Sequence, residues 1–245
     1  MKIATRDLLA ALLVEALDHA VAAAALRCLA AYCCTIKREP PAMPVDRFLL
    51  PAPAAERDDV LRLLQENALL SWDLRGRSGR VSLAPAFTPE HAEIMTKLTQ
   101  YSAVLDAWQP EEAAPALTTA LRKGVLLFNH RLFFEVHEVL EAQWVQETGE
   151  VKRFLQGLIQ IAVAFYHLGN HNLRGTLSLL QDGLEKTTPH QPAFLGIELR
   201  DFSAELEACR DELLRLGPES FAQIQPERIP QMRFAPSTRD GSTPK

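Results

Sequence analysis

The chain has 245 residues, of which 47% are hydrophobic and 23% are charged, and its formal net charge is −5. This composition is that of a soluble globular protein and excludes a wholly disordered chain. The negative balance gives no reason to expect nucleic acid or an anionic membrane as the main partner. With 11 glycines in this length, helices are expected rather than a many-stranded β-fold.

Neither a membrane span nor a disulfide framework is expected. The apolar stretch 8–34 is interrupted by Glu15, Asp18 and Arg27, each of which would cost about 2.5–3.5 kcal/mol at the centre of a bilayer. This stretch is therefore predicted to form one or two core helices. The four cysteines include no C-x-x-C pair, which favours free thiols in a reducing compartment. We expect a cytoplasmic protein that does not contact a membrane.

The first 110 residues are predicted to form a helical module with one β-hairpin. Apolar residues recur at helical spacing in three segments, and a proline-rich break separates the first two. The hairpin is indicated by two stretches of alternating apolar and polar residues around a glycine-containing turn. Thr88 is the expected N-cap of the last helix, with proline at its first position. The expected elements are helices at 4–34, 54–68 and 88–108 and a hairpin at 69–83.

A helix followed by a hairpin is similar to a winged helix. Arg75, Arg77 and Arg80 would lie on the wing, where they are placed to contact phosphates. The charge of the module argues against this use, because residues 1–110 contain 12 Lys and Arg against 13 Asp and Glu. We therefore expect a module for protein contacts or for covering the helical bundle, with nucleic-acid binding as the alternative.

The second half is predicted to be a helical bundle over residues 111–217. Gly169 and Asn170 are expected to end the third helix of the bundle in a left-handed conformation. Asn172 is the expected N-cap of the next helix. Residues 218–245 are polar and proline-rich and are predicted to be a tail. The five helices are expected at 113–128, 131–147, 151–168, 173–187 and 194–216.

A polar site is predicted on the second helix of this bundle. His137 and Glu141 are four residues apart and therefore share a helix face. Trp144 follows one turn later, and Phe133 and Phe134 precede by one turn. These bulky groups would partly desolvate the pair, which makes its hydrogen bonding important.

The following helix, residues 154–168, is expected to supply the partners of this pair. It is apolar on nearly all sides, except that Gln156, Gln160 and His167 lie within about 40° of one another. A buried polar stripe needs hydrogen-bond partners, and the His–Glu pair on the preceding helix is the nearest candidate. Gly157 beside the stripe would allow a close helix approach. The supporting residues are expected to be Gln156, Gln160, Glu138, Trp144 and Asn172.

Three interpretations of this cluster stay open. One is a structural hydrogen-bond network that fixes the register of the helices. A second is a metal site in which His137, Glu141 and His167 bind Zn, Mn or Fe, since imidazole and carboxylate suit these ions. The third is general acid–base chemistry on an organic ligand by His137, tuned by Glu141. The sequence lacks H-E-x-x-H and G-x-S-x-G, which excludes the corresponding metalloprotease and hydrolase assignments.

The span from about residue 116 to residue 214 resembles the bacterial and archaeal family known as domain of unknown function 309. The resemblance rests on His137-x-x-x-Glu141-x-x-Trp144, on the segment QGLIQ at 156–160, on Tyr166-His167-Leu168 and on Asn172 with Gly175. It implies a compact all-helical domain in which the His-x-x-x-Glu motif is a metal-binding or otherwise functional site, and it assigns no reaction.

Two functional hypotheses from different classes follow. The first is a divalent-metal or small-ligand site of unassigned activity, a hydrolytic one included. The second is a non-catalytic interaction or regulatory protein whose polar cluster is structural. Such a protein could contact nucleic acid through the winged-helix-like module. The sequence leaves the partner and the oligomeric state open, a homo-oligomer included.

Overall fold

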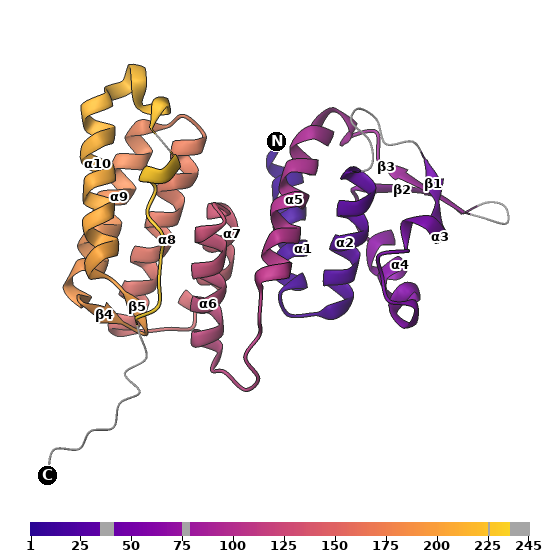
Figure 1. Cartoon of the computed structure of the whole chain (residues 1–245), viewed down its shortest axis with the longest axis horizontal. Helices are drawn as coiled ribbons and strands as arrows, with labels where there is room; N and C mark the ends of the chain where they lie inside the picture. Colours follow the sequence, from indigo (N-terminus) through magenta and orange to yellow (C-terminus); the bar gives the residue numbers. More distant parts are fainter. Residues whose placement is uncertain (35–41, 75–78, 225, 236–245) are drawn as a thin grey trace, which may run out of the picture. The chain divides into compact units, whose positions relative to one another are not determined.

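The protein is mainly α-helical, with a few short antiparallel strands, as its composition and residue spacing predict. The chain divides into two compact units, Met1–Pro110 and Glu111–Lys245 (Figure 1). In the part that is described, no helix has the length and apolar character needed to cross a bilayer. The computed structural model describes residues 1–34, 42–74, 79–224 and 226–235.

The alanine-rich second helix is central to the first unit. The helices of this unit are α1 (Ile3–Ala16), α2 (Ala20–Cys34), α3 (Val45–Phe48), α4 (Arg57–Gln65) and α5 (His91–Ala107). The predicted helical stretch 4–34 is thus two helices. Helix α2 packs against α1, α4 and α5, and its Leu26 and Cys28 are fully buried. Alanine suits this position because its small side chain lets neighbouring helices approach on several sides.

The predicted hairpin is present and belongs to a three-stranded antiparallel sheet. Its strands β2 (Leu70–Asp73) and β3 (Arg80–Leu83) pair, and β1 (Met43–Pro44) adds to the other edge of β3. The hydroxyl of Tyr32 on α2 accepts a hydrogen bond from the Leu83 N–H at 3.1 Å. A ring contact between Tyr32 and Phe48, with centroids 5.7 Å apart, joins the same residue to α3.

The helix predicted to begin at Thr88 begins three residues later. Thr88–Glu90 is a 3₁₀ turn, and α5 starts at His91. Glu90 is 7% exposed, and its carboxylate accepts hydrogen bonds from the Lys2 N–H at 2.6 Å and the Thr5 hydroxyl at 3.1 Å. Burial acts to raise the pKa of Glu90, but these hydrogen bonds and the Lys2 charge outweigh it and lower the pKa. The expected threonine cap is thus not formed: Glu90 is the residue before α5, its side chain does not cap that helix, and its carboxylate binds the start of α1.

The described residues of the second unit form five α-helices, and each packs against the next along the chain (Figure 1). They are α6 (Ala116–Asn129), α7 (Phe133–Trp144), α8 (Gly149–Gly169), α9 (Leu173–Thr187) and α10 (Arg200–Ser220). Phe128 of α6 contacts Phe165 of α8 and Phe202 of α10, with ring centroids 5.7 and 5.8 Å apart. These edge-to-face contacts bring the first and last helices of the unit to one aromatic core.

The last helix starts later than predicted. A two-stranded hairpin, β4 (Ala193–Phe194) and β5 (Ile197–Glu198), occupies the residues expected to be its first turn. Strands of two residues leave no alternation to detect, so residue spacing cannot reveal them.

Helices α8 and α9 approach each other closely through two glycines. A Cβ atom on Gly183 would lie 2.6 Å from Ile161 Cγ1 and 2.9 Å from the Gly157 carbonyl oxygen. A Cβ atom on Gly157 would lie 2.8 Å from Thr187 Cγ2. The close approach predicted at Gly157 is confirmed, and the helix that approaches is α9.

The described part of the predicted tail packs along the second unit. The Asn129 side chain donates to the Met232 carbonyl and accepts from its N–H, both at 2.9 Å. The Arg131 guanidinium donates to the Ile229 carbonyl at 3.0 Å, and the Arg233 carbonyl accepts from the backbone of β5. Residues 227–233, called the C-terminal strap below, are therefore held in place by their own backbone groups.

Candidate functional site

His137 lies between two carboxylates on α7. Its Nδ1 atom is 3.1 Å from Glu138 Oε1, and its Nε2 atom is 3.6 Å from Glu141 Oε2. The imidazole stacks on the Phe134 ring, with centroids 6.1 Å apart. A neutral imidazole carries one N–H, so only the imidazolium can direct a proton toward each glutamate. His137, Glu138 and Glu141 are called the His137 cluster.

The His137 cluster is open to solvent. The side chains of His137 and Glu141 are 28% and 50% exposed, and that of Glu138 is 42% exposed. Helical spacing predicted the Glu141 contact, whereas the shorter contact comes from Glu138, the next residue in the chain. A small molecule can reach all three side chains without any movement of the helices.

The glutamines of α8 do not complete this cluster. Within the described ranges, no hydrogen bond joins Gln156 or Gln160 to His137 or Glu141, and the buried Gln160 Oε1 has no partner. The buried Nε1 of Trp144 is likewise without a described partner, while the Lys152 ammonium lies 4.5 Å from its ring centroid. Phe134, rather than Trp144, is thus the aromatic neighbour of His137.

His167 belongs to a second polar cluster at the junction of α8 and α9. The Asn172 side-chain amide donates to His167 Nδ1 at 3.1 Å, and its oxygen accepts from the Gly175 N–H at 3.0 Å. Asn172 is therefore the predicted N-cap of α9. A Cβ atom on Gly175 would lie 2.7 Å from Asn172 Nδ2, so a side chain there would displace the cap. His167, Asn172 and Gly175 are called the α8–α9 junction.

The left-handed residue that ends α8 is not one of those predicted. His171, with φ of 57°, adopts this conformation, while Gly169 and Asn170 do not. The turn is closed by the His171 and Asn172 N–H groups, which donate to the Leu168 and His167 carbonyls. These hydrogen bonds require a positive φ at His171, one residue after the predicted Gly169-Asn170 pair.

The structure does not bring the three predicted metal ligands together as one group. No set of three or more His, Cys, Asp or Glu side chains in the described residues is placed to hold a metal ion. The Nδ1 atom of His167 accepts the Asn172 hydrogen bond, which leaves only Nε2 as a donor atom for an ion. The Zn, Mn or Fe site at His137, Glu141 and His167 stays a prediction.

Two buried charged residues of the second unit were not predicted from the sequence. Glu135 on α7 is fully buried and Lys123 on α6 is 6% exposed, and each interacts with other groups of the protein. Glu135 occupies the i+3 position of the apolar series that begins at Leu132 and continues at Val136. This spacing could have predicted the burial of Glu135, because every position on the apolar face of a helix is buried, including one that carries a charged residue.

The predicted wing arginines are only partly described. Arg75 and Arg77 lie outside the described residues. Arg80 is described, and its guanidinium donates a hydrogen bond to the Ala42 carbonyl. This side chain is thus used to hold the segment before β1 against the sheet.

Fold and site together define a mainly α protein whose second unit is a helical bundle with an open His–Glu cluster on α7. Residues 121–179 match the family model described as Domain of unknown function (DUF309). The matched region contains both the His137 cluster and the α8–α9 junction. No curated protein matches the chain.

Proposed function

We propose that the His137 cluster binds a small ligand that carries positive charge or hydrogen-bond donors, and that His137 exchanges a proton with it. The observation that carries this proposal is the placement of an accessible imidazole between two accessible carboxylates. Ionised carboxylates only accept hydrogen bonds, so the cluster presents acceptors to solvent. Histidine is the side chain best suited to gain and lose a proton near neutral pH.

The cluster also has the elements of acid–base chemistry. In a catalytic form, Glu141 would orient the imidazole, and His137 would pass a proton to or from the bound ligand. A hydrolytic reaction is one such use. A divalent ion would take His137 and Glu141 as two of its ligands, which makes metal binding the alternative within the same site.

The test is a titration of the full chain with small cationic probes followed by NMR of the His137 ring. Agmatine, spermidine and guanidinium are suitable probes because they combine charge with several N–H donors. We expect the ring signals of His137 to shift saturably, and Glu141→Gln and Glu138→Gln to weaken binding by about tenfold. Zn²⁺ and Mn²⁺ are titrated in parallel, with elemental analysis of protein purified without added metal.

Matched controls keep this test specific. Glu207 on α10 and His19 between α1 and α2 are exposed and lie outside the cluster, so Glu207→Gln and His19→Ala should leave binding unchanged. If one Zn²⁺ or Mn²⁺ binds per chain and depends on both His137 and Glu141, the site is a metal centre instead. If no probe shifts the His137 ring, the cluster is structural.

We also propose that the first unit is a winged-helix-like module used for protein contacts. Its order of elements supports this, because α2, α3 and α4 precede a hairpin and the strand order is β1-β3-β2. The exposed Asp58 and Asp59 on α4 would repel phosphates at the helix that reads DNA in such modules.

Fluorescence anisotropy with labelled duplex DNA at low salt tests the use of this module. We expect no binding, and no difference between the native chain and Arg80→Gln. If the chain binds DNA in a salt-dependent way and Arg80→Gln weakens this binding, the role of the unit is nucleic-acid contact and not protein contact.

A further inference from the structure

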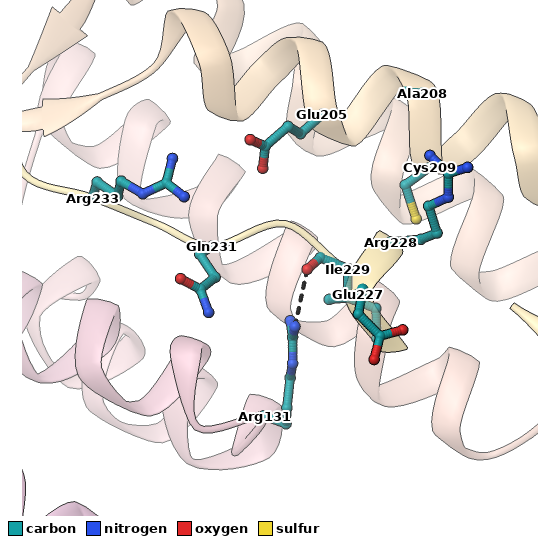
Figure 2. Close-up of a pocket in the computed structure, with 9 residues that line it drawn as sticks. All are labelled: Arg131, Glu205, Ala208, Cys209, Glu227, Arg228, Ile229, Gln231 and Arg233. Atoms are coloured by element: carbon teal, nitrogen blue, oxygen red, sulfur yellow. Dashed lines mark hydrogen bonds between the residues drawn. The ribbon is translucent and has the colours of Figure 1, made fainter. Parts of the chain in front are cut away.

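A pocket of about 480 Å³ opens between α10 and the C-terminal strap in the second unit. Figure 2 shows Glu205, Ala208 and Cys209 on the α10 side and the strap on the other. Small-molecule sites usually enclose about 300–1,000 Å³, so the pocket is large enough for a ligand of a few heavy atoms. It shares no lining residue with the His137 cluster and is a separate candidate site.

The strap side of the pocket is held by specific hydrogen bonds. Arg131, in the turn between α6 and α7, donates to the Ile229 carbonyl, as the dashed line in Figure 2 shows, and to the Pro230 carbonyl at 3.2 Å. Asn129 holds Met232 through both of its backbone groups. The pocket is therefore formed before a ligand arrives, which lowers the entropic cost of binding.

Two of the arginines that line the pocket already have partners. Arg228 Nε lies 3.1 Å from Glu212 Oε2, which makes an ion pair. Burial lowers the pKa of the Arg131 guanidinium, and the charges of Cys209 and Glu227 act in the opposite direction. Arg131 is also occupied by the two strap carbonyls. Arg131 and Arg228 therefore have partners without a ligand.

Two opposite charges face each other across the pocket without a direct partner. In the described parts of the chain, the carboxylates of Glu205 and Glu227 and the Arg233 guanidinium are exposed and have no hydrogen-bond or ion-pair partner. Arg233 is thus the pocket cation without a partner, and Glu205 is the carboxylate that faces it. Figure 2 shows these two side chains pointing toward each other across the pocket. The Arg233 backbone is fixed because its carbonyl accepts from the Glu198 N–H at 2.9 Å. A ligand between them would meet one negative and one positive group.

We propose that this pocket binds a small zwitterion of the amino-acid class, with its ammonium group at Glu205 and its carboxylate at Arg233. A guanidinium can bind a carboxylate through two parallel hydrogen bonds, and a carboxylate accepts from an ammonium group. Ala208, Cys209 and Ile229 line the pocket and provide an apolar surface for a side chain of the ligand. A singly charged molecule would satisfy only one of the two charged residues.

The test uses the full ¹⁵N-labelled chain and four amino acids as probes: glycine, L-alanine, L-valine and L-leucine. We expect L-valine at millimolar concentration to shift the backbone amide signals of Cys209 and Arg233 in a saturable way. Isobutylamine and isovalerate each keep the apolar group of valine with one of its charges. We expect them to bind at least about tenfold more weakly, because each leaves one charged group unmatched.

Two charge-neutralising variants and two matched controls complete the design. Glu205→Gln and Arg233→Gln should each weaken L-valine binding by about tenfold. Glu207→Gln on α10 and Arg174→Gln on α9 change exposed charges that do not line the pocket and should bind as the native chain does. The proposal is overturned if none of the four amino acids shifts these amides, or if isobutylamine or isovalerate binds as tightly as L-valine. Native-like binding by both pocket variants would also overturn it.

Discussion

The two polar clusters of the second unit contain histidines in the same matched region but differ in how their polar atoms are used. In the α8–α9 junction, Asn172 serves both His167 and the Gly175 N–H, so its amide is occupied within the protein. In the His137 cluster, a partly exposed imidazole lies between two exposed carboxylates. The junction behaves as a structural device, whereas the His137 cluster keeps acceptors available for another molecule.

This difference shows that the residues of one sequence motif can serve different purposes, some of them packing and capping and others binding. Gly157 and Gly183 allow close helix packing, and Gly175 makes room for the Asn172 cap. His137 and Glu141 are not required for a close helix contact of this kind. We therefore expect substitutions at the junction and at the helix contact to change stability, and substitutions in the His137 cluster to change binding.

The largest expected effect is at the contact of α8 with α9. Gly183→Ala would place a methyl group 2.6 Å from Ile161 Cγ1 and 2.9 Å from a backbone oxygen, so the helices must separate. Overpacking of this kind costs about 1–3 kcal/mol in the free energy of unfolding, measured by urea denaturation. Gly169→Ala is the matched control, since a Cβ atom there meets nothing within 4 Å. Equal stability of both variants would contradict the close contact.

Removal of the α9 cap comes next. Asn172→Ala removes the hydrogen bonds to the Gly175 N–H and to His167, and loss of such a cap costs about 0.5–2 kcal/mol. Thermal unfolding of the variant measures this cost. Asn170→Ala is the control, because Asn170 is exposed and makes a single side-chain bond to the Tyr166 carbonyl. If the control loses as much stability as Asn172→Ala, the loss does not come from the cap of α9.

A smaller change is expected in the reactivity of Cys209. Burial raises the pKa of this thiol to about 11, so alkylation should be slow at neutral pH and accelerate about tenfold per pH unit. The raised pKa keeps the thiol protonated and unreactive in the folded chain. Alkylation therefore depends on local opening that exposes Cys209 to solvent. In a Cys34→Ser background, Asn172→Ala should speed alkylation about fivefold, in line with roughly 1 kcal/mol of lost stability. Mass spectrometry of the modified peptide gives the rate, and an unchanged rate would mean that the junction does not control opening of α10.

The smallest effect on stability is expected at His137. Because this side chain is accessible and packs mainly on Phe134, His137→Ala should change the free energy of unfolding by no more than about 0.5 kcal/mol. Its effect should appear in ligand binding instead. A loss of stability as large as that of Asn172→Ala would place the His137 cluster with the structural motifs and remove the contrast between them.

Much of the helical architecture follows from residue spacing alone. Helices α6 to α9 of the second unit and the hairpin of the first are where apolar periodicity and turn residues predict them, within three residues, whereas α10 starts six residues later than predicted. Asn172 was recognisable as a cap because its side chain acts within four residues of its own position. The contact of His137 with Glu141 is of the same kind, since one helical turn fixes it.

Contacts between distant residues were decided only by the tertiary structure. His167 was expected to face His137, but the turn after α8 places Asn172 beside it. The strap was predicted as a tail because its polar, proline-rich sequence has no periodicity, yet Asn129 and Arg131, about a hundred residues earlier, bind its backbone. Periodicity reports which face of a helix is buried and not which helix covers it. Local spacing thus determined the elements, the Asn172 cap and the His137 cluster, while packing of distant segments decided the close contact of α8 with α9 and the pocket beneath the strap.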